Sequence, residues 1–96
     1  MKVVINVCYG GFSVSREVYE RLGKDWDGYG YKFDNARTNP DLIAVIEEIG
    51  SERGSGFCAN LKVIDIPEEA TDWELSEYDG AEEILCVIGG KIQHLC

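Results

Sequence analysis

Residues 73–96 read WELSEYDGAEEILCVIGGKIQHLC, and this stretch decides the fold. It contains Asp79-Gly80 and Gly89-Gly90, and both dipeptides are signals for a tight two-residue hairpin turn. The segments on either side of each turn are rich in apolar residues. The stretch therefore predicts a meander of three antiparallel strands, over residues 73–78, 81–88 and 91–96.

The pairing of these strands follows from the length of the turns. Two-residue loops at 79–80 and 89–90 predict these opposed pairs: Leu75 with Ile84, Trp73 with Cys86, Ile84 with Leu95, and Cys86 with Gln93. Side chains alternate between the two faces of a strand, so the register decides which residues share a face. The residues predicted to share the core face are Trp73, Leu75, Ile84, Cys86, Ile88 and Leu95.

Capping residues predict two helices further upstream. Ser13 or Ser15 caps the first helix, which ends at Gly23, where a left-handed residue is wanted. The second begins at Asn39-Pro40-Asp41, which combines an Asn cap, a proline at the first helical position and an acidic residue facing the helix dipole. Gly50 ends this helix.

Two apolar runs, residues 2–9 and 57–66, predict strands. Residues 24–38 form an aromatic loop in which a short irregular strand is an alternative, and residues 51–56 are expected to be flexible. The chain is thus predicted to be a single α+β domain, residues 1–96, with about five mostly antiparallel strands and two helices.

The charge is strongly negative and unevenly placed. The chain carries 18 acidic and 9 basic residues, for a net charge of −9, which argues against a direct nucleic-acid binder. No Lys or Arg lies between Lys62 and Lys91. Most basic residues lie at or before position 37, so an anionic ligand is expected in the N-terminal half. They are Lys2, Arg16, Arg21, Lys24, Lys32 and Arg37.

No run of residues approaches the roughly 20 apolar positions that a membrane-spanning helix needs. The opening Lys2–Val7 is too short, and too interrupted by Asn6, for a secretory signal. We therefore expect a cytoplasmic protein whose four cysteines are reduced. Because a domain this small gains stability by association, we also expect a homo-oligomer.

The segment Tyr9–Arg16 carries the most suggestive chemistry. A glycine turn, two hydroxyl groups and a helix N-terminus suit a phosphate or carboxylate. The predicted ligand-binding residues are Gly10, Gly11, Ser13 and Ser15 for phosphate contacts, Arg16 and Arg37 for charge, and Phe12, Trp26 and Tyr29 for stacking on a base. The alternative is a tight turn followed by an ordinary helix cap.

Other candidate sites are weaker. The only close pair of zinc ligands is His94-x-Cys96, and its two residues lie on the sheet face opposite Cys86. Cys8 precedes a helix start, but the chain has a single histidine to serve as its base. Buried thiols are the simpler interpretation, so no catalytic residue, metal or cofactor is predicted.

Four carboxylates surround one predicted hairpin: Glu77, Asp79, Glu82 and Glu83. They suit either a divalent cation or the imitation of a nucleic-acid backbone, although a solvated sheet edge is the simpler interpretation. Glu77 and Glu82 are predicted to lie opposite each other, which costs stability unless another group compensates.

The sequence resembles a family of small, mostly uncharacterised phage-encoded proteins that open with a strand and a "CYGGFxLS" turn. The likeness lies in Val4–Ser15, Arg37–Ile43, Val45–Gly50, Leu61–Pro67 and Glu77–Glu82. The tail from Ile84 departs, since relatives tend to end in a basic, Trp-containing segment.

This resemblance implies a viral accessory protein in the cytoplasm of a host bacterium. Our leading hypothesis is a sponge that sequesters a small nucleotide-derived immune signal, such as a cyclic ADP-ribose isomer or a cyclic oligonucleotide. The alternative is an acidic protein that binds and inhibits a host defence protein directly. An enzyme that degrades the same signals is a third reading, less favoured than a binding protein.

Overall fold

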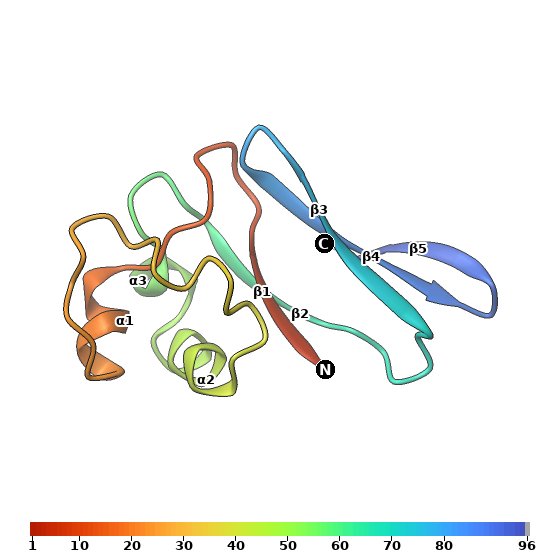
Figure 1. Ribbon diagram of the computed structural model, residues 1–96, viewed down its shortest axis with the longest axis horizontal. Helices are drawn as coiled ribbons and strands as arrows, with labels where there is room; N and C mark the ends of the chain where they lie inside the picture. Colours follow the sequence, from red (N-terminus) through yellow and green to blue (C-terminus); the bar gives the residue numbers. More distant parts are fainter. Residues whose placement is uncertain (96) are drawn as a thin grey trace.

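The structure, a computed structural model, describes residues 1–95 (Figure 1). The strands are β1 (Lys2–Asn6), β2 (Leu61–Asp65), β3 (Asp72–Tyr78), β4 (Ala81–Ile88) and β5 (Lys91–Leu95). The helices are α1 (Arg16–Arg21), α2 (Pro40–Ile49) and α3 (Ser51–Gly54). The strands form two sheets, β1-β2 and β3-β4-β5, and every pair is antiparallel. The predicted α+β class is confirmed.

The C-terminal meander has the predicted register. Leu75 pairs with Ile84 and Trp73 with Cys86, and the two predicted pairs between β4 and β5 are also present. Asp79 and Gly80 have φ angles of 51° and 87°, the left-handed conformations that a tight hairpin turn of this kind requires. Local turn chemistry was therefore sufficient to predict how this sheet is assembled.

The inner face of the meander packs on β1-β2. Ile84 and Cys86 join Val3, Ile5 and Ile64 in one buried cluster. The remaining members of the predicted core face, Trp73, Leu75, Ile88 and Leu95, pack against this cluster while staying partly exposed. The predicted shared face is thus the face that closes the core.

The opposite face of β1-β2 packs on the helices. Val4 and Leu61 belong to a second buried cluster with Val18 and Tyr19 of α1 and with residues of α2. The molecule therefore has three layers, with β1-β2 between the helices and the meander (Figure 1). Only the inner face of the meander lies against another layer.

The second predicted helix is confirmed, including its cap. The Asn39 side chain accepts hydrogen bonds from the N–H groups of Asp41 (2.9 Å) and Leu42 (3.2 Å), and α2 ends before Gly50. Ser15 occupies the N-cap of α1, but its side chain makes no capping hydrogen bond.

Three details of the prediction were wrong. Residues 51–54, expected to be flexible, form the short helix α3, which is stabilised when Ser55 Oγ donates to the carbonyl of Ser51 (2.6 Å). The run from residue 57 is a strand only from Leu61, because Phe57 is 92% exposed and Cys58 has a left-handed φ of 64°. The first strand ends at Asn6 rather than at residue 9. Residues 24–38 contain no strand.

Within residues 1–95, no helix is both long enough and apolar enough to cross a lipid bilayer.

The register predicts that substitutions at two neighbouring residues of β4 lower the free energy of unfolding by different amounts. Ile84 is fully buried and faces β1-β2, whereas Leu85 points to the other side of the meander and is half-buried. Ile84→Ala should lower the free energy of unfolding by about 2–5 kcal/mol. Leu85→Ala should lower it by less than about 1.5 kcal/mol, because less apolar surface is lost from the core. Urea denaturation of both variants checks this, and a larger cost for Leu85→Ala would contradict the register.

Candidate functional site

Arg37, a predicted ligand-binding residue, is held by a carboxylate of the meander. Its Nη1 lies 2.6 Å from Oε1 of Glu82 and its Nη2 lies 2.8 Å from Oε2, a bidentate pair between residues 45 positions apart. The exposed fractions of the two side chains are 12% and 6%. A paired and largely buried guanidinium is not free to meet an incoming phosphate.

Further contacts complete the surroundings of this pair. Arg37 also donates to Oδ1 of Asp34 (3.0 Å) and to its backbone carbonyl (2.9 Å), and its guanidinium lies 3.6 Å from the centre of the Phe12 ring. Glu82 accepts a third hydrogen bond from the backbone N–H of Asn6 (2.8 Å). Phe12, predicted to stack on a base, is instead buried beneath Arg37.

A hollow of about 410 Å³ opens beside this pair. It is lined by Gly11, Phe12, Asp34, Arg37, Leu75, Glu77, Gly80 and Glu82. Three of the nine predicted ligand-binding residues, Gly11, Phe12 and Arg37, thus meet at one cavity. They share it with three carboxylates against one guanidinium, an arrangement that repels phosphate.

The predicted clash between Glu77 and Glu82 is present and is compensated. The two residues are opposed in the β3–β4 register. Arg37 neutralises Glu82, while Glu77 accepts a hydrogen bond from the N–H of Gly80 (2.8 Å). Glu77 and Glu82 therefore have structural partners, and no group of three metal-ligating side chains occurs within residues 1–95. Cys96, one of the considered zinc ligands, lies outside the described residues.

The glycine turn is packed against a neighbouring loop. A side chain at Gly10 would collide with the backbone carbonyl of Cys58, and the Cys8 thiol lies 2.8 Å from that same oxygen. Ser13 is buried, with its hydroxyl donating to the carbonyl of Phe57 (3.3 Å). The backbone N–H of Ser15 donates to the carbonyl of Gly54 (2.9 Å), and its Oγ is buried without a partner among the described residues. These contacts fit the alternative interpretation, a tight turn before a helix.

The other predicted residues lie apart from the hollow. Arg16 is exposed and forms no ion pair within residues 1–95. Trp26 packs edge-on against Tyr19, and Tyr29 stacks on Tyr31 with 6.1 Å between the ring centres. The nine residues therefore do not form one binding site in this structure, and nucleotide sequestration stays an untested prediction.

Tyr19 organises the aromatic loop. Its hydroxyl donates to Oδ2 of Asp27 (2.8 Å) and accepts from the N–H of Lys32 (2.9 Å). Burial, followed by the bond to Asp27, raises the pKa of Tyr19 to about 12. The backbone N–H groups of Gly30 and Tyr29 donate to Asp27 and lower the pKa of its carboxyl to about 2.

Sequence reasoning missed one group of surface residues. Tyr9 and Phe57 lie in loops, and Tyr78 ends β3 at the hairpin loop. These three loops meet at one end of the molecule, and the three side chains are 73%, 92% and 75% exposed. Figure 1 shows the three loops side by side. These loops are joined by close contacts of Gly10 with Cys58 and of Gly80 with Tyr9 and Gly11. Nothing in the sequence predicts such contacts between distant segments.

Comparison of the chain with protein-family models, with curated proteins and with solved structures gave no significant match.

The Arg37–Glu82 pair should matter more for stability than the exposed pair beside it. Glu82→Gln removes the buried, bidentate counter-charge of Arg37, leaves only the exposed Asp34 carboxylate beside it, and should cost about 3–5 kcal/mol of unfolding free energy. Asp34→Asn removes a carboxylate that is 60% exposed and should cost at most about 1 kcal/mol. Equal costs in urea denaturation would show that Arg37 is not held chiefly by Glu82.

Tyr19 should make folding sensitive to alkali. In the unfolded chain a tyrosine ionises near pH 10, whereas folded Tyr19 keeps its proton to about pH 12. The folded state then binds more protons between these values, so its stability is complete below pH 10 and is lost as the pH rises to 12. Denaturation midpoints at several alkaline pH values should fall more steeply for the wild type than for Tyr19→Phe. Parallel curves would contradict the assignment.

Proposed function

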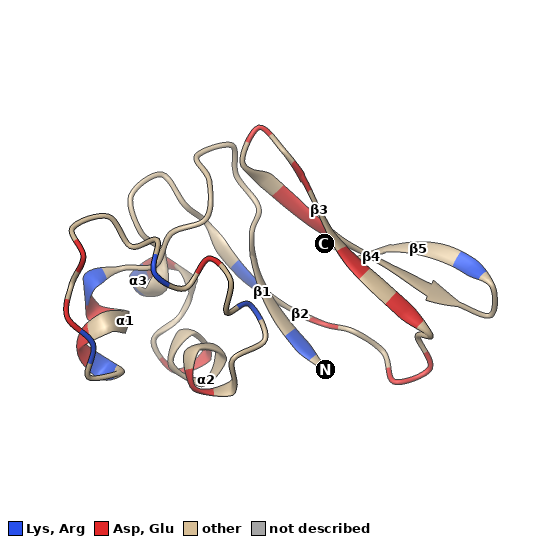
Figure 2. Ribbon diagram, viewed as in Figure 1, with Lys and Arg blue, Asp and Glu red and all other residues tan. Residues whose placement is uncertain are grey.

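We propose that this protein acts by binding a basic partner protein through the acidic surface of its C-terminal meander. The observation that carries the proposal is a set of exposed carboxylates without internal counter-charges. Within residues 1–95 no ion pair involves Glu68, Glu69, Asp72 or Glu74, and all four residues are exposed. Figure 2 shows the acidic positions along β3, along β4 and in the connection that leads into β3.

The arrangement of charge supports a protein partner over an anionic small molecule. Several cations of the N-terminal half are neutralised internally: Lys2 by Glu47, Arg21 by Glu17 and Glu48, and Arg37 by Glu82. The negative field of the meander is not balanced in this way, because no Lys or Arg occurs between Lys62 and Lys91. Such a field raises the association rate of a cationic partner by roughly 10–1,000-fold at low ionic strength.

The resemblance to phage-encoded proteins suggests the biological setting. In that setting the partner is a host defence protein, and the acidic meander competes for a surface that otherwise contacts nucleic acid. This interpretation matches the acidic inhibitor considered from the sequence.

Charge reversal on this acidic surface, which includes the connection into β3, should weaken capture of the partner. Immobilised wild-type protein is expected to retain a basic protein from a bacterial extract and to release it as salt is raised. Glu69→Lys with Glu74→Lys should reduce retention by roughly tenfold or more, because both side chains are exposed and belong to the acidic surface. Quantitative mass spectrometry of the retained proteins measures the effect.

Two controls make this test specific. Glu20→Lys with Glu52→Lys changes the net charge equally on the helical side of the molecule and should leave retention intact. Arg16→Ala should also leave it intact. If both double variants lost the same amount of retained protein, net charge alone would explain the effect, and the proposal would be contradicted. A nucleotide that copurifies with the wild type and is lost in Arg16→Ala would favour sequestration instead.

A further inference from the structure

Strand β4 has a composition that the rest of the molecule does not explain. Its central residues, Ile84-Leu85-Cys86-Val87-Ile88, are all apolar. An uninterrupted apolar run is typical of a strand that is covered on both faces, whereas a strand with one solvent-exposed face alternates apolar and polar residues. In the structure only the face of Ile84 and Cys86 is covered, by β1-β2. Leu85 and Val87 point to the side without a layer.

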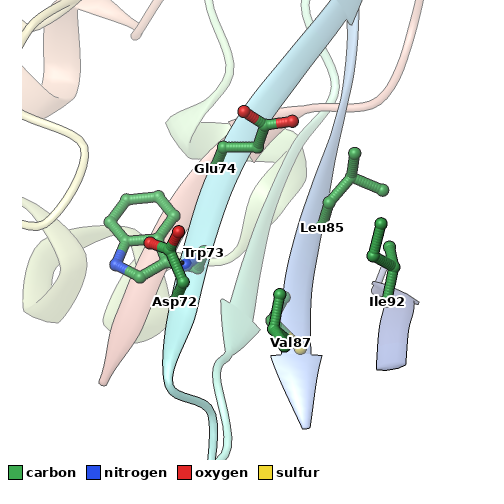
Figure 3. Close-up of a pocket in the computed structure, with 7 residues that line it drawn as sticks. Asp72, Trp73, Glu74, Leu85, Val87 and Ile92 are labelled. Carbon is green, nitrogen blue, oxygen red and sulfur yellow. Dashed lines mark hydrogen bonds between the residues drawn. The ribbon is translucent and has the colours of Figure 1, made fainter. Parts of the chain in front are cut away.

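The neighbouring strand extends this apolar surface. The register pairs Val87 with Ile92 of β5, and Ile92 is 67% exposed. A hollow of about 460 Å³ lies here and is lined by Asp72, Trp73, Glu74, Leu85, Cys86, Val87 and Ile92. Figure 3 shows Leu85, Val87 and Ile92 near one another, with Asp72 and Glu74 extending from β3. We call the surface formed by Asp72, Glu74, Glu83, Leu85, Val87 and Ile92 the outer face.

Charge on the outer face argues against a second copy as its cover. Along the three strands, the outward positions given by the register contain Asp72, Glu74 and Glu83 but no Lys or Arg, and the one histidine among them, His94, lies 3.4 Å from Glu83. Two copies placed face to face would bring these carboxylates together without a Lys or Arg on either side. A partner with its own cations beside an apolar stripe would satisfy both the apolar centre and the acidic margin.

The dimensions of the outer face suit one helix. Neighbouring strands lie about 4.8 Å apart, so three strands span roughly 10 Å, close to the 10–12 Å diameter of an α-helix. The eight residues of β4 extend over roughly 27 Å, which is the length of a helix of about 18 residues. A helix on the open face of an antiparallel sheet is also a common way to complete a layered domain.

We infer that the outer face is the docking surface for a basic amphipathic helix of a partner protein. Its apolar stripe would cover Leu85, Val87 and Ile92, and its Lys or Arg side chains would pair with Asp72, Glu74 and Glu83. This inference rests on the proposed function and adds to it the site and the kind of segment recognised.

Fluorescence anisotropy with designed peptides tests the inference. The probe is a dye-labelled helix of about 18 residues built from leucine and lysine, with the leucines on one face. The controls are a peptide of the same composition with the order scrambled, and the amphipathic peptide with glutamate in place of lysine. The wild-type protein should bind the probe roughly tenfold more tightly than the scrambled peptide and should not bind the acidic one.

Protein variants locate the surface. Ile92→Ser should weaken binding of the probe by roughly fivefold or more, because it removes the most exposed apolar side chain of the outer face, which lies on β5 beside Val87. Phe57→Ser is the matched control, since Phe57 is also a large exposed apolar residue but lies in the loop between α3 and β2 and not on the outer face. It should leave the affinity unchanged. Unchanged melting temperatures would confirm that both variants are folded.

The outcomes separate the two proposals. Equal affinity for the amphipathic and scrambled peptides would overturn the docking surface while leaving charge-driven capture in place. Weakening by Phe57→Ser but not by Ile92→Ser would also overturn it. If neither basic peptide binds, the proposed function fails and the inference fails with it. Sedimentation could also show that the wild type is a dimer and that Ile92→Ser is a monomer. That result would mean that a second copy of the chain, and not a partner helix, covers the outer face.

Discussion

The ion pair between Arg37 and Glu82 joins the two halves of this protein. Arg37 lies in the loop before α2, and Glu82 lies on β4, so the pair ties the helical layer directly to the meander. Desolvating two charges is costly, and here the cost is offset because Glu82 accepts three hydrogen bonds and Arg37 also contacts Asp34 and Phe12. Asn6 adds a neutral link when its side chain donates to the carbonyl of Gly80 (2.8 Å).

This constraint determines which surfaces are available for binding. Because Arg37 pairs with Glu82, its guanidinium is not free to bind an anion, and three carboxylates line the adjoining hollow. The apolar cluster around Ile84 and Cys86 packs the inner face of the meander on β1-β2, and the register then places Leu85, Val87 and Ile92 on the other side. The pairing of Arg37 therefore weakens the case for an anion site at the turn, and the acidic surface of the sheet is the better candidate.

The sequence predicted those parts of the fold that depend on neighbouring residues. Two-residue turns determine register by counting, and Asn39-Pro40 caps α2 through bonds to the next turn, so both predictions are confirmed. The partner of Arg37 is 45 residues away, and nothing local distinguishes Glu82 from Glu83 except strand parity. Strand parity does place Glu82 on the inner face, where a buried carboxylate needs a positively charged partner. This was the signal in the sequence that could have predicted the ion pair. The contact between Gly10 and Cys58 left no comparable trace.

The proposed binding surface is the outer face of the meander and not the turn at residues 10–16. Two-dimensional ¹H–¹⁵N spectra recorded during titration with a basic amphipathic helix, and separately with a cyclic ADP-ribose isomer, test it most directly. We expect the helix to shift the amide signals of Leu85, Val87 and Ile92, and the nucleotide to shift no amide signal. Shifts centred on Gly11, Ser13 and Arg16 upon addition of the nucleotide, with a silent meander, would contradict it.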